Sequence, residues 1–557
     1  MSTVYPIVNT NSGPVKGISR KNDVGKVFYS FQHIPYAQQP IGELRFKDPR
    51  PVIPWNQPLD CTKEGPKCFQ FDNLSGELEF FGSDECLGVN IFTPNLKPWR
   101  PLPVCVWIHG GGFVVGSSST DIYGPDLIVE KGVIMVSFNY RLGIFGFLSL
   151  KDPKLGVPGN AGLKDQSMAL KWIKENISHF GGDPNNITVF GGSAGGASVH
   201  YQMISPMSKN LFNRAVPMSG SALSPWATVP TIYPELLKRL AAVLRLPEDA
   251  NDEILYEALL KCDPKELLIY VETLIKPEEK LNSAAAWSSF LPQVEPYVSE
   301  MCFLPASPLE LGRNAWSLGM DVIFGGCENE GFLWNGFSVD EAGMMEINKN
   351  NAYLLPKELF EELGVEEGNS KGKILKEFYF GEKDVSRENF DIYLSYLDEA
   401  TFWHQMYRAF VLQRQNSSGN TFLYNLNIPP SVDVPGFYKL FRDSYQLTHM
   451  NGTCHGEDLP LLFKTKYDRR FQKGDDNYAA QQVFLNFFIE FVKRGDPNFE
   501  SLETTNDEPW KPLEKGQAEN LSTLEILRNE IRVQQLTKGE KIKVWNGLYD
   551  DNKELLM

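Results

Sequence analysis

The stretch that most constrains this chain is Gly191-Gly192-Ser193-Ala194-Gly195, a Gly-x-Ser-x-Gly motif. It follows a β-rich run at 187–190 and precedes small residues that can begin a helix. A serine at the apex of a sharp strand–turn–helix has strained backbone geometry, so its neighbours need little or no side chain. The same five residues also occur by chance in glycine-rich turns. The motif therefore indicates a serine nucleophile, but other segments of the chain must support this interpretation.

That support comes from a second glycine-rich segment, His109-Gly110-Gly111-Gly112-Phe113. It follows a continuous apolar run at 103–108, which is typical of a strand buried on both faces of a parallel sheet. Three glycines allow the backbone N–H groups to approach a ligand closely, as an oxyanion hole requires. The two motifs in this order are typical of esterases and lipases.

The remaining pattern predicts an α/β fold with a large, mostly parallel central sheet flanked by helices. Apolar runs at 133–140, 320–326 and 421–426 predict further strands, and 164–178 and 479–493 predict helices. We expect a small antiparallel hairpin within about 4–27 and helical cap insertions at about 228–290 and 339–415. No repeat or interdomain linker interrupts the pattern, so we expect residues 1–557 to form one domain.

A serine nucleophile needs a base, and the base needs an orienting carboxylate. In this class of fold the chain order is serine, acid, histidine. Glu328 and Glu330 both follow the predicted strand at 320–326, and the residues alone do not choose between them. His449 and His455 share a loop near the C-terminal end, and the small neighbours of His455 slightly favour it.

Composition excludes several other classes of function. The chain has 70 acidic and 54 basic residues and a net charge of -16, which disfavours a nucleic-acid partner. Its eight cysteines lack zinc-site spacing, so we expect no metal, and the predicted chemistry needs no cofactor. Residues 1–17 show no signal-peptide pattern, and no apolar run approaches the length of a membrane span. We therefore expect a cytoplasmic protein.

Beyond the two glycine motifs, several segments resemble the type-B carboxylesterase/cholinesterase family of α/β-hydrolases, and within it the intracellular α-esterases of insects. The resemblance covers nearly the whole chain. The matching segments are 31–46, 109–113, 139–143, 159–166, 180–184, 191–195, 218–221 and 495–497.

The resemblance implies a role for each residue that matches a family motif. It makes Ser193 the nucleophile, Glu330 the acid and His455 the base. It makes Gly111, Gly112 and Ala194 the oxyanion-hole donors. It also places Trp226, Trp287 and Phe290 near the substrate pocket, and it pairs Cys68 with Cys86 in a disulfide.

Two departures from the family narrow the expected substrate. The residue before the nucleophile is usually acidic in this family, and in juvenile-hormone esterases it is typically glutamine, but here it is Gly192. Between Cys68 and Cys86, where cholinesterases keep a tryptophan for quaternary ammonium, there is no tryptophan. A cholinesterase is therefore disfavoured.

We expect a broad-specificity serine carboxylesterase that hydrolyses small esters through an acyl-enzyme, as a monomer or weak homodimer. The resemblance implies a detoxifying role toward xenobiotics, including insecticide resistance. One alternative is a slow-turnover esterase that sequesters xenobiotics or organophosphates on Ser193. Another is a non-catalytic adhesion-type relative, which the presence of all three triad residues disfavours.

Overall fold

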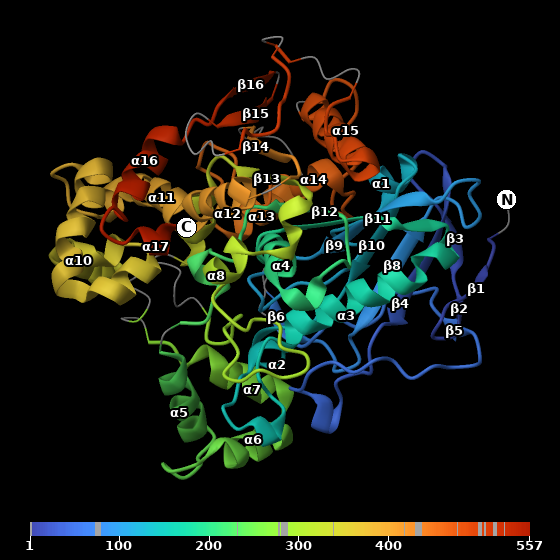
Figure 1. Cartoon of the computed structure of the whole chain (residues 1–557), viewed down its shortest axis with the longest axis horizontal. Helices are drawn as coiled ribbons and strands as arrows, with labels where there is room; N and C mark the ends of the chain where they lie inside the picture. Colours follow the sequence, from blue (N-terminus) through green and yellow to red (C-terminus); the bar gives the residue numbers. More distant parts are fainter. Residues whose placement is uncertain are drawn as a thin grey trace.

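The computed structural model describes residues 3–72, 79–230, 232–276, 279, 288–337, 339–416, 418–428, 437–475, 477–499, 504–505, 508–515, 521–528 and 530–557 (Figure 1). Among these residues, an eleven-stranded sheet has the strand order β16-β15-β14-β13-β12-β11-β9-β10-β8-β4-β3. Its strands are β3 (Ile18–Lys21), β4 (Val27–Pro35), β8 (Gly88–Thr93), β9 (Leu102–Ile108), β10 (Ile134–Phe138), β11 (Gly182–Gly192), β12 (Arg214–Met218), β13 (Asp321–Cys327), β14 (Thr421–Asn427), β15 (Ser522–Leu527) and β16 (Ile531–Gln535).

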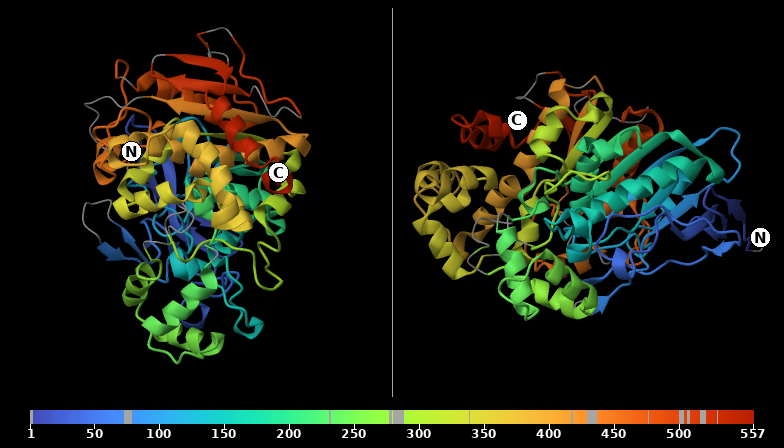
Figure 2. Two further views of the ribbon diagram at one scale, coloured as in Figure 1. Left: turned by 90° about the vertical axis from the view of Figure 1, so that its left-hand side faces the viewer. Right: turned by 60° about the horizontal axis from the view of Figure 1, so that its bottom comes forward.

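The middle of this sheet is parallel and its two edges are antiparallel. The seven strands from β10 to β15 pair in parallel, whereas β8, β4 and β3 at one edge and β16 at the other pair antiparallel. Figures 1 and 2 show the N-terminal strands (blue) and the C-terminal strands (red) far apart in the sheet. The predicted α/β architecture is confirmed.

Alternating side chains of the central strands pack into two separate cores. On β9, Val104, Val106 and Ile108 belong to one core, and Cys105 and Trp107 belong to the other. This period of two is that of a strand buried on both faces. The first core includes residues of α3 (Ala161–Asn176) and α4 (Ala194–Ile204), and the second includes residues of α1 (Asp126–Glu130) and α15 (Tyr478–Arg494).

Two groups of helices lie within the predicted insertions, and Figure 1 shows them beside the sheet in green and in yellow. The first group is α5 (Tyr233–Val243), α6 (Asp252–Lys261) and α7 (Pro264–Glu272). The second is α9 (Glu341–Lys349), α10 (Lys357–Phe380), α11 (Phe390–Asp398) and α12 (His404–Asn416). A single π-helical turn, Glu399–Trp403, joins α11 to α12. The other helices are α2 (Gly143–Phe147), α8 (Pro308–Arg313), α13 (Phe437–Ser444), α14 (Leu459–Leu462), α16 (Gly539–Gly547) and α17 (Lys553–Leu556).

The N-terminal segment contributes to two sheets rather than to one hairpin. Strands β1 (Ile7–Asn9) and β2 (Pro14–Lys16) pair antiparallel, and β5 (Leu59–Asp60) adds to β2. Strand β3 instead joins the large sheet by pairing with β4. A further two-stranded sheet pairs β6 (Gln70–Asp72) with β7 (Glu79–Phe81).

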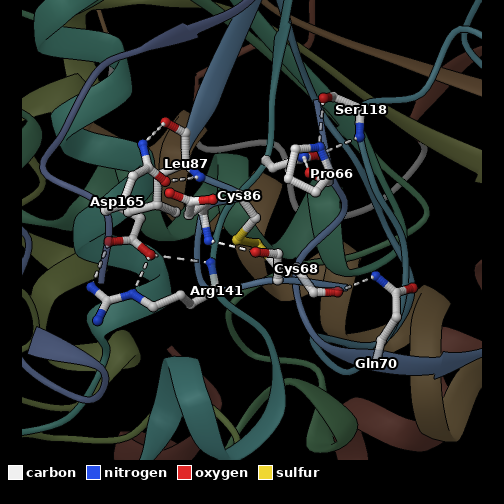
Figure 3. Close-up of a disulfide and its surroundings, with 12 residues drawn as sticks. Pro66, Cys68, Gln70, Cys86, Leu87, Ser118, Arg141 and Asp165 are labelled. Atoms are coloured by element: carbon white, nitrogen blue, oxygen red, sulfur yellow. Dashed lines mark hydrogen bonds and ion pairs between the residues drawn. A yellow bond between two sulfur atoms is a disulfide. The ribbon is translucent and has the colours of Figure 1, made fainter. Parts of the chain in front are cut away.

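Cys68 and Cys86 form a disulfide, as the family resemblance implies (Figure 3). It closes the segment that carries β6 and β7. Nearby, the buried Arg141–Asp165 pair is joined by two short contacts, from Nε to Oδ2 (2.7 Å) and from Nη2 to Oδ1 (2.6 Å). Within the described ranges, no helix has both the length and the apolar character needed to cross a membrane.

Candidate active site

Ser193 stands at the turn between β11 and α4 in a strained backbone conformation, with φ 60° and ψ -128°. Its N–H donates to the carbonyl of Met218 on β12 (2.9 Å). The glycines around it are required by close approach of the backbone. A Cβ at Gly195 would lie 2.1 Å from the Ile108 carbonyl, and one at Gly196 would lie 2.2 Å from the Met218 carbonyl. The turn is therefore held on both sides by neighbouring strands.

The elbow leaves Ser193 partly exposed while every residue of α4 is buried. Ala194 is the first residue of α4, so its N–H has no partner within the helix. A serine hydroxyl at such a place is accessible to a substrate and lies beside an unpaired helix N-terminus, which favours developing negative charge.

The His-Gly-Gly-Gly loop packs directly against this elbow. A Cβ at Gly110 would lie 3.0 Å from the Cβ of Ser193 and 2.7 Å from the Gly192 carbonyl. Gly111 and Gly112 follow with φ of 106° and 60°, a backbone region that glycine adopts readily. Both are partly exposed, as Ser193 is. Thus the two predicted glycine motifs, about eighty residues apart in the chain, meet at one place.

The structure brings Glu330 and His455 together. His455 Nδ1 lies 2.5 Å from Glu330 Oε2, and the two residues are 4% and 0% exposed. The other carboxylate oxygen of Glu330 accepts the N–H of Cys327 at the end of β13 (2.7 Å). The two loops are joined by their backbones as well, because Asn329 N–H donates to the Thr453 carbonyl (2.9 Å).

The other two candidates lie elsewhere. Glu328 directs its carboxylate to Lys538 (3.3 Å) and Asn425 (2.5 Å), away from the imidazole. His449 is exposed to solvent. Of the alternatives that the sequence left open, only Glu330 and His455 are in contact.

The loop that carries His455 is fixed by a buried ion pair. Arg442 on α13 contacts Glu457 (2.5 Å) and also donates to the backbone carbonyls of Gly452 (2.5 Å) and Met450 (2.9 Å). Glu457 in turn accepts the N–H of Cys454 (2.7 Å). These contacts span the loop on both sides of the imidazole and hold its backbone.

A second carboxyl is buried beside the triad. Asp458 follows His455 by three residues and is 1% exposed, with the Tyr424 hydroxyl 3.3 Å away. Burial, and to a smaller extent the nearby Glu330, raise the pKa of Asp458 to about 7 against the opposing effect of His455. Asp458 is therefore largely uncharged below neutral pH.

Two of the three residues expected near the substrate pocket are buried against other aromatic side chains. Trp226 is buried, its indole N–H donates to the Thr401 carbonyl (2.8 Å), and its ring lies 5.5 Å from that of Phe402. Phe290 is buried against Tyr233, with ring centroids 5.8 Å apart. Trp287 lies outside the described residues.

Sequence reasoning missed Phe402, whose ring lies 4.8 Å from the imidazole of His455. It comes from the π-helical turn Glu399–Trp403, which the sequence pattern presents only as part of an aromatic helix. The one available signal is the run of aromatic residues around His404. His404 itself is buried and bonds through Nε2 to Asn546 Oδ1 (3.0 Å).

Gly192 leaves the elbow without a charge where the family usually has an acid. A Cβ at this position would lie 3.5 Å from the Trp107 ring and 3.6 Å from Leu459 Cδ2, which is ordinary contact with apolar groups. Among the described residues, no group of three or more His, Cys, Asp and Glu side chains is arranged to hold a metal ion.

The whole chain matches known esterases. The model of the carboxylesterase family matches residues 4–545. Esterase B1 of Culex pipiens is 33% identical over 558 residues and covers 99% of both chains, and juvenile hormone esterase of Tribolium castaneum is 32% identical and covers 89% of this chain and 84% of its own.

Solved structures agree with these matches. Juvenile hormone esterase from Manduca sexta, with OTFP covalently attached, superposes with a TM-score of 0.83 at 28% identity, covering 98% of this chain and all of its own. A PNB esterase superposes with a TM-score of 0.76 at 27% identity, covering 97% of this chain. With this fold and these relatives, the chain belongs to the carboxylesterase family of α/β-hydrolases and is a carboxylic ester hydrolase.

Proposed function

We propose that the chain hydrolyses carboxylic esters through an acyl-enzyme on Ser193, with His455 as the base and Glu330 as the acid. The observation that carries this proposal is the 2.5 Å contact between His455 Nδ1 and Glu330 Oε2. With that contact made, Nδ1 carries the proton and the other ring nitrogen is left free to accept one. The strained, partly exposed Ser193 supports its role as the nucleophile.

The reaction follows from these roles. The Ser193 hydroxyl oxygen attacks the ester carbonyl while its proton passes to His455 Nε2, and the carbonyl oxygen becomes an oxyanion. The N–H groups of Gly111, Gly112 and Ala194 stabilise that oxyanion. The imidazolium then gives its proton to the departing alcohol. In the second half of the reaction the same nitrogen takes a proton from water, whose oxygen attacks the acyl carbonyl. The imidazolium then returns that proton to the Ser193 oxygen as the carboxylic acid leaves.

A pre-steady-state assay with a chromogenic acetate or butyrate ester tests this proposal. We expect a burst of leaving group that counts one site per chain. Ser193→Ala and His455→Ala are each expected to lower kcat by about 10⁴- to 10⁶-fold. Turnover close to that of the wild type in either variant would refute the assignment.

The groups around Ser193 and His455 bear on the class of substrate. We infer a preference for uncharged esters, including xenobiotic ones, because Gly192 puts no charge beside the nucleophile and the ring of Phe402 packs on His455, with Trp226 behind it. The rival function is sequestration of xenobiotics or organophosphates through slow deacylation. A burst followed by fast steady turnover favours hydrolysis, and a stoichiometric burst with very slow turnover favours sequestration.

We also propose a cytoplasmic protein that is a monomer or weak homodimer. Six of the eight cysteines carry free thiols, which suits a reducing compartment. Cell fractionation combined with thiol alkylation tests the compartment, and light scattering tests the assembly. A protein recovered only outside the cytosol with Cys68 and Cys86 fully protected from alkylation would overturn the first of these proposals.

A further inference from the structure

The turn that carries Glu330 is held from both sides by two buried charged residues. On one side, Asp398 at the end of α11 accepts the N–H of Gly331, directly after Glu330, through Oδ1 (2.8 Å). On the other side, Lys538 Nζ donates to the backbone carbonyl of Glu328, two residues before Glu330 (2.8 Å). Asp398 is 1% exposed and Lys538 is 3% exposed. Both contacts are made to the backbone of the turn and leave the carboxylate of Glu330 to His455 and Cys327.

These two residues are also coupled to each other. Lys538 Nζ lies 3.9 Å from Asp398 Oδ2 and 3.6 Å from Glu399 Oε1, so one buried ammonium faces several acids. Burial raises the pKa of Asp398 to about 7, and Lys538 is the strongest group acting against that shift. Removing either residue therefore leaves the other buried charge without one of its opposite charges, which lowers the stability of the folded state because a low dielectric solvates charge poorly.

The packing leaves the turn little room to move. A Cβ at Gly331 would lie 2.2 Å from the Leu394 carbonyl and 2.7 Å from the N of Asp398, so α11 lies directly on the turn. The indole N–H of Trp403 donates to the Cys327 carbonyl at the start of the same turn (2.9 Å).

A π-helical turn lets one short segment bring the side chains of Asp398 and Trp403 to the turn of Glu330. Between Asp398 and Trp403 the chain also places Phe402 against His455 (4.8 Å). Such turns widen a helix by one residue and redirect its side chains, and they are frequent at functional sites. Here the segment reaches the acid and the base of the proposed triad together.

We propose that Asp398 and Lys538 are a positioning pair for Glu330: they fix the acid's turn through its backbone and so hold the carboxylate against His455. This inference rests on the proposed function of Glu330. It assigns no chemical step to either residue. Their effect is on geometry, and a displacement of about 1 Å in an active site can cost on the order of 10²-fold in rate.

Lys538→Met is the decisive variant, with Lys541→Met as its matched control. Lys541 belongs to the same cluster, with Nζ 3.1 Å from Glu399 Oε2, and is farther toward solvent. It also donates to the hydroxyl of Ser395 (3.1 Å), so its contacts go to α11 and the π-helical turn rather than to the turn of Glu330. Turnover is to be measured per active site titrated in the burst, so that unfolded protein does not enter kcat.

We expect Lys538→Met to lower kcat about 10- to 100-fold with little change in KM. Lys538→Arg, which keeps the charge and the donor, is expected to restore most of kcat, and Lys541→Met to leave it within about threefold of the wild type. If Lys538→Met does not fold, Asp398→Asn provides the milder test, because the amide oxygen still accepts the Gly331 N–H while the charge that faces Lys538 is lost.

The double variant Lys538→Met/Glu330→Gln separates positioning from general destabilisation. A residue that acts only through Glu330 has no further effect once Glu330 is disabled, so we expect the kcat of the double variant to equal that of Glu330→Gln. The positioning role of Asp398 and Lys538 would be overturned by an unchanged kcat per site in Lys538→Met, by an equal loss in Lys541→Met, or by a full additional loss in the double variant. Absence of both a burst and steady turnover in the folded wild type would instead refute the proposed function itself.

Discussion

Glu330→Gln replaces one carboxylate oxygen of a buried side chain by NH₂, and the contacts of Glu330 explain why this single change is expected to disable the triad. Oε1 accepts the N–H of Cys327 (2.7 Å) and Oε2 faces Nδ1 of His455 (2.5 Å), so both positions need an acceptor. An amide supplies only one. If its oxygen serves Cys327, its NH₂ faces His455 and forces the proton onto Nε2, where the ring can no longer accept one from Ser193. If it flips, two N–H donors face each other at Cys327.

The expected cost follows from this loss of the working tautomer. In a serine-protease triad the corresponding change costs about 10⁴-fold in kcat, which is about 5.4 kcal/mol at about 1.36 kcal/mol per tenfold. The mismatched hydrogen bond is expected to lower the free energy of unfolding by about 1–3 kcal/mol. The large kinetic loss and the smaller stability loss are therefore distinguishable.

The assay is kcat per titrated site with a chromogenic ester, and the matched control is Glu328→Gln. Glu328 lies two residues away, faces Lys538 and Asn425, and keeps its backbone carbonyl in the variant. We expect this control to stay within about threefold of the wild type. A kcat of Glu330→Gln within about tenfold of the wild type, or an equal loss in the control, would show that Glu330 does not orient His455.

Three further predictions concern stability. Phe402→Ala removes the ring packed on His455 and is expected to lower the unfolding free energy by about 3–5 kcal/mol, measured in urea; a loss below about 1 kcal/mol would contradict this packing. The raised pKa of Asp458 means that the folded state binds this proton more tightly than the unfolded state, so this group is expected to lower the free energy of unfolding as the pH rises from about 4 to about 7. In urea titrations Asp458→Asn should make that pH dependence less steep, and an unchanged pH dependence would contradict the prediction. Replacing Cys68 and Cys86 by serine opens a link of sequence separation 18 and is expected to cost about 3 kcal/mol in unfolding, whereas an unchanged midpoint would argue that the bond is absent in the purified protein.

The sequence predicts those parts of the site that short local motifs encode. The backbone around Gly195 and Gly110 approaches its neighbours too closely for a Cβ, so the requirement for glycine is visible in the sequence itself. The continuous apolar runs likewise predict the central strands. The sequence pattern does not predict β15 and β16, because polar residues alternate with apolar ones in both strands, including the buried Thr523 and Glu525 in β15.

The choice between neighbouring candidates depends on long-range geometry. Glu328 and Glu330 are two residues apart in one loop, and only the start of a 3₁₀ helix at Glu330 turns its carboxylate toward the loop of His455. Phe402 lies about fifty residues from His455 in sequence, and a π-helical turn breaks the 3.6-residue period that pattern reading relies on. Asp398 and Lys538 are about 140 residues apart, and their bonds to the turn of Glu330 span 67 and 210 residues, so charge patterns in the sequence do not reveal them.

Labelling the active protein with a fluorophosphonate ester and mapping the modified peptide by mass spectrometry tests whether Ser193 is the nucleophile. We expect one adduct per chain, on Ser193, formed in step with the loss of esterase activity and absent from Ser193→Ala. An adduct on another residue that abolishes activity, or full activity after stoichiometric modification of Ser193, would contradict it.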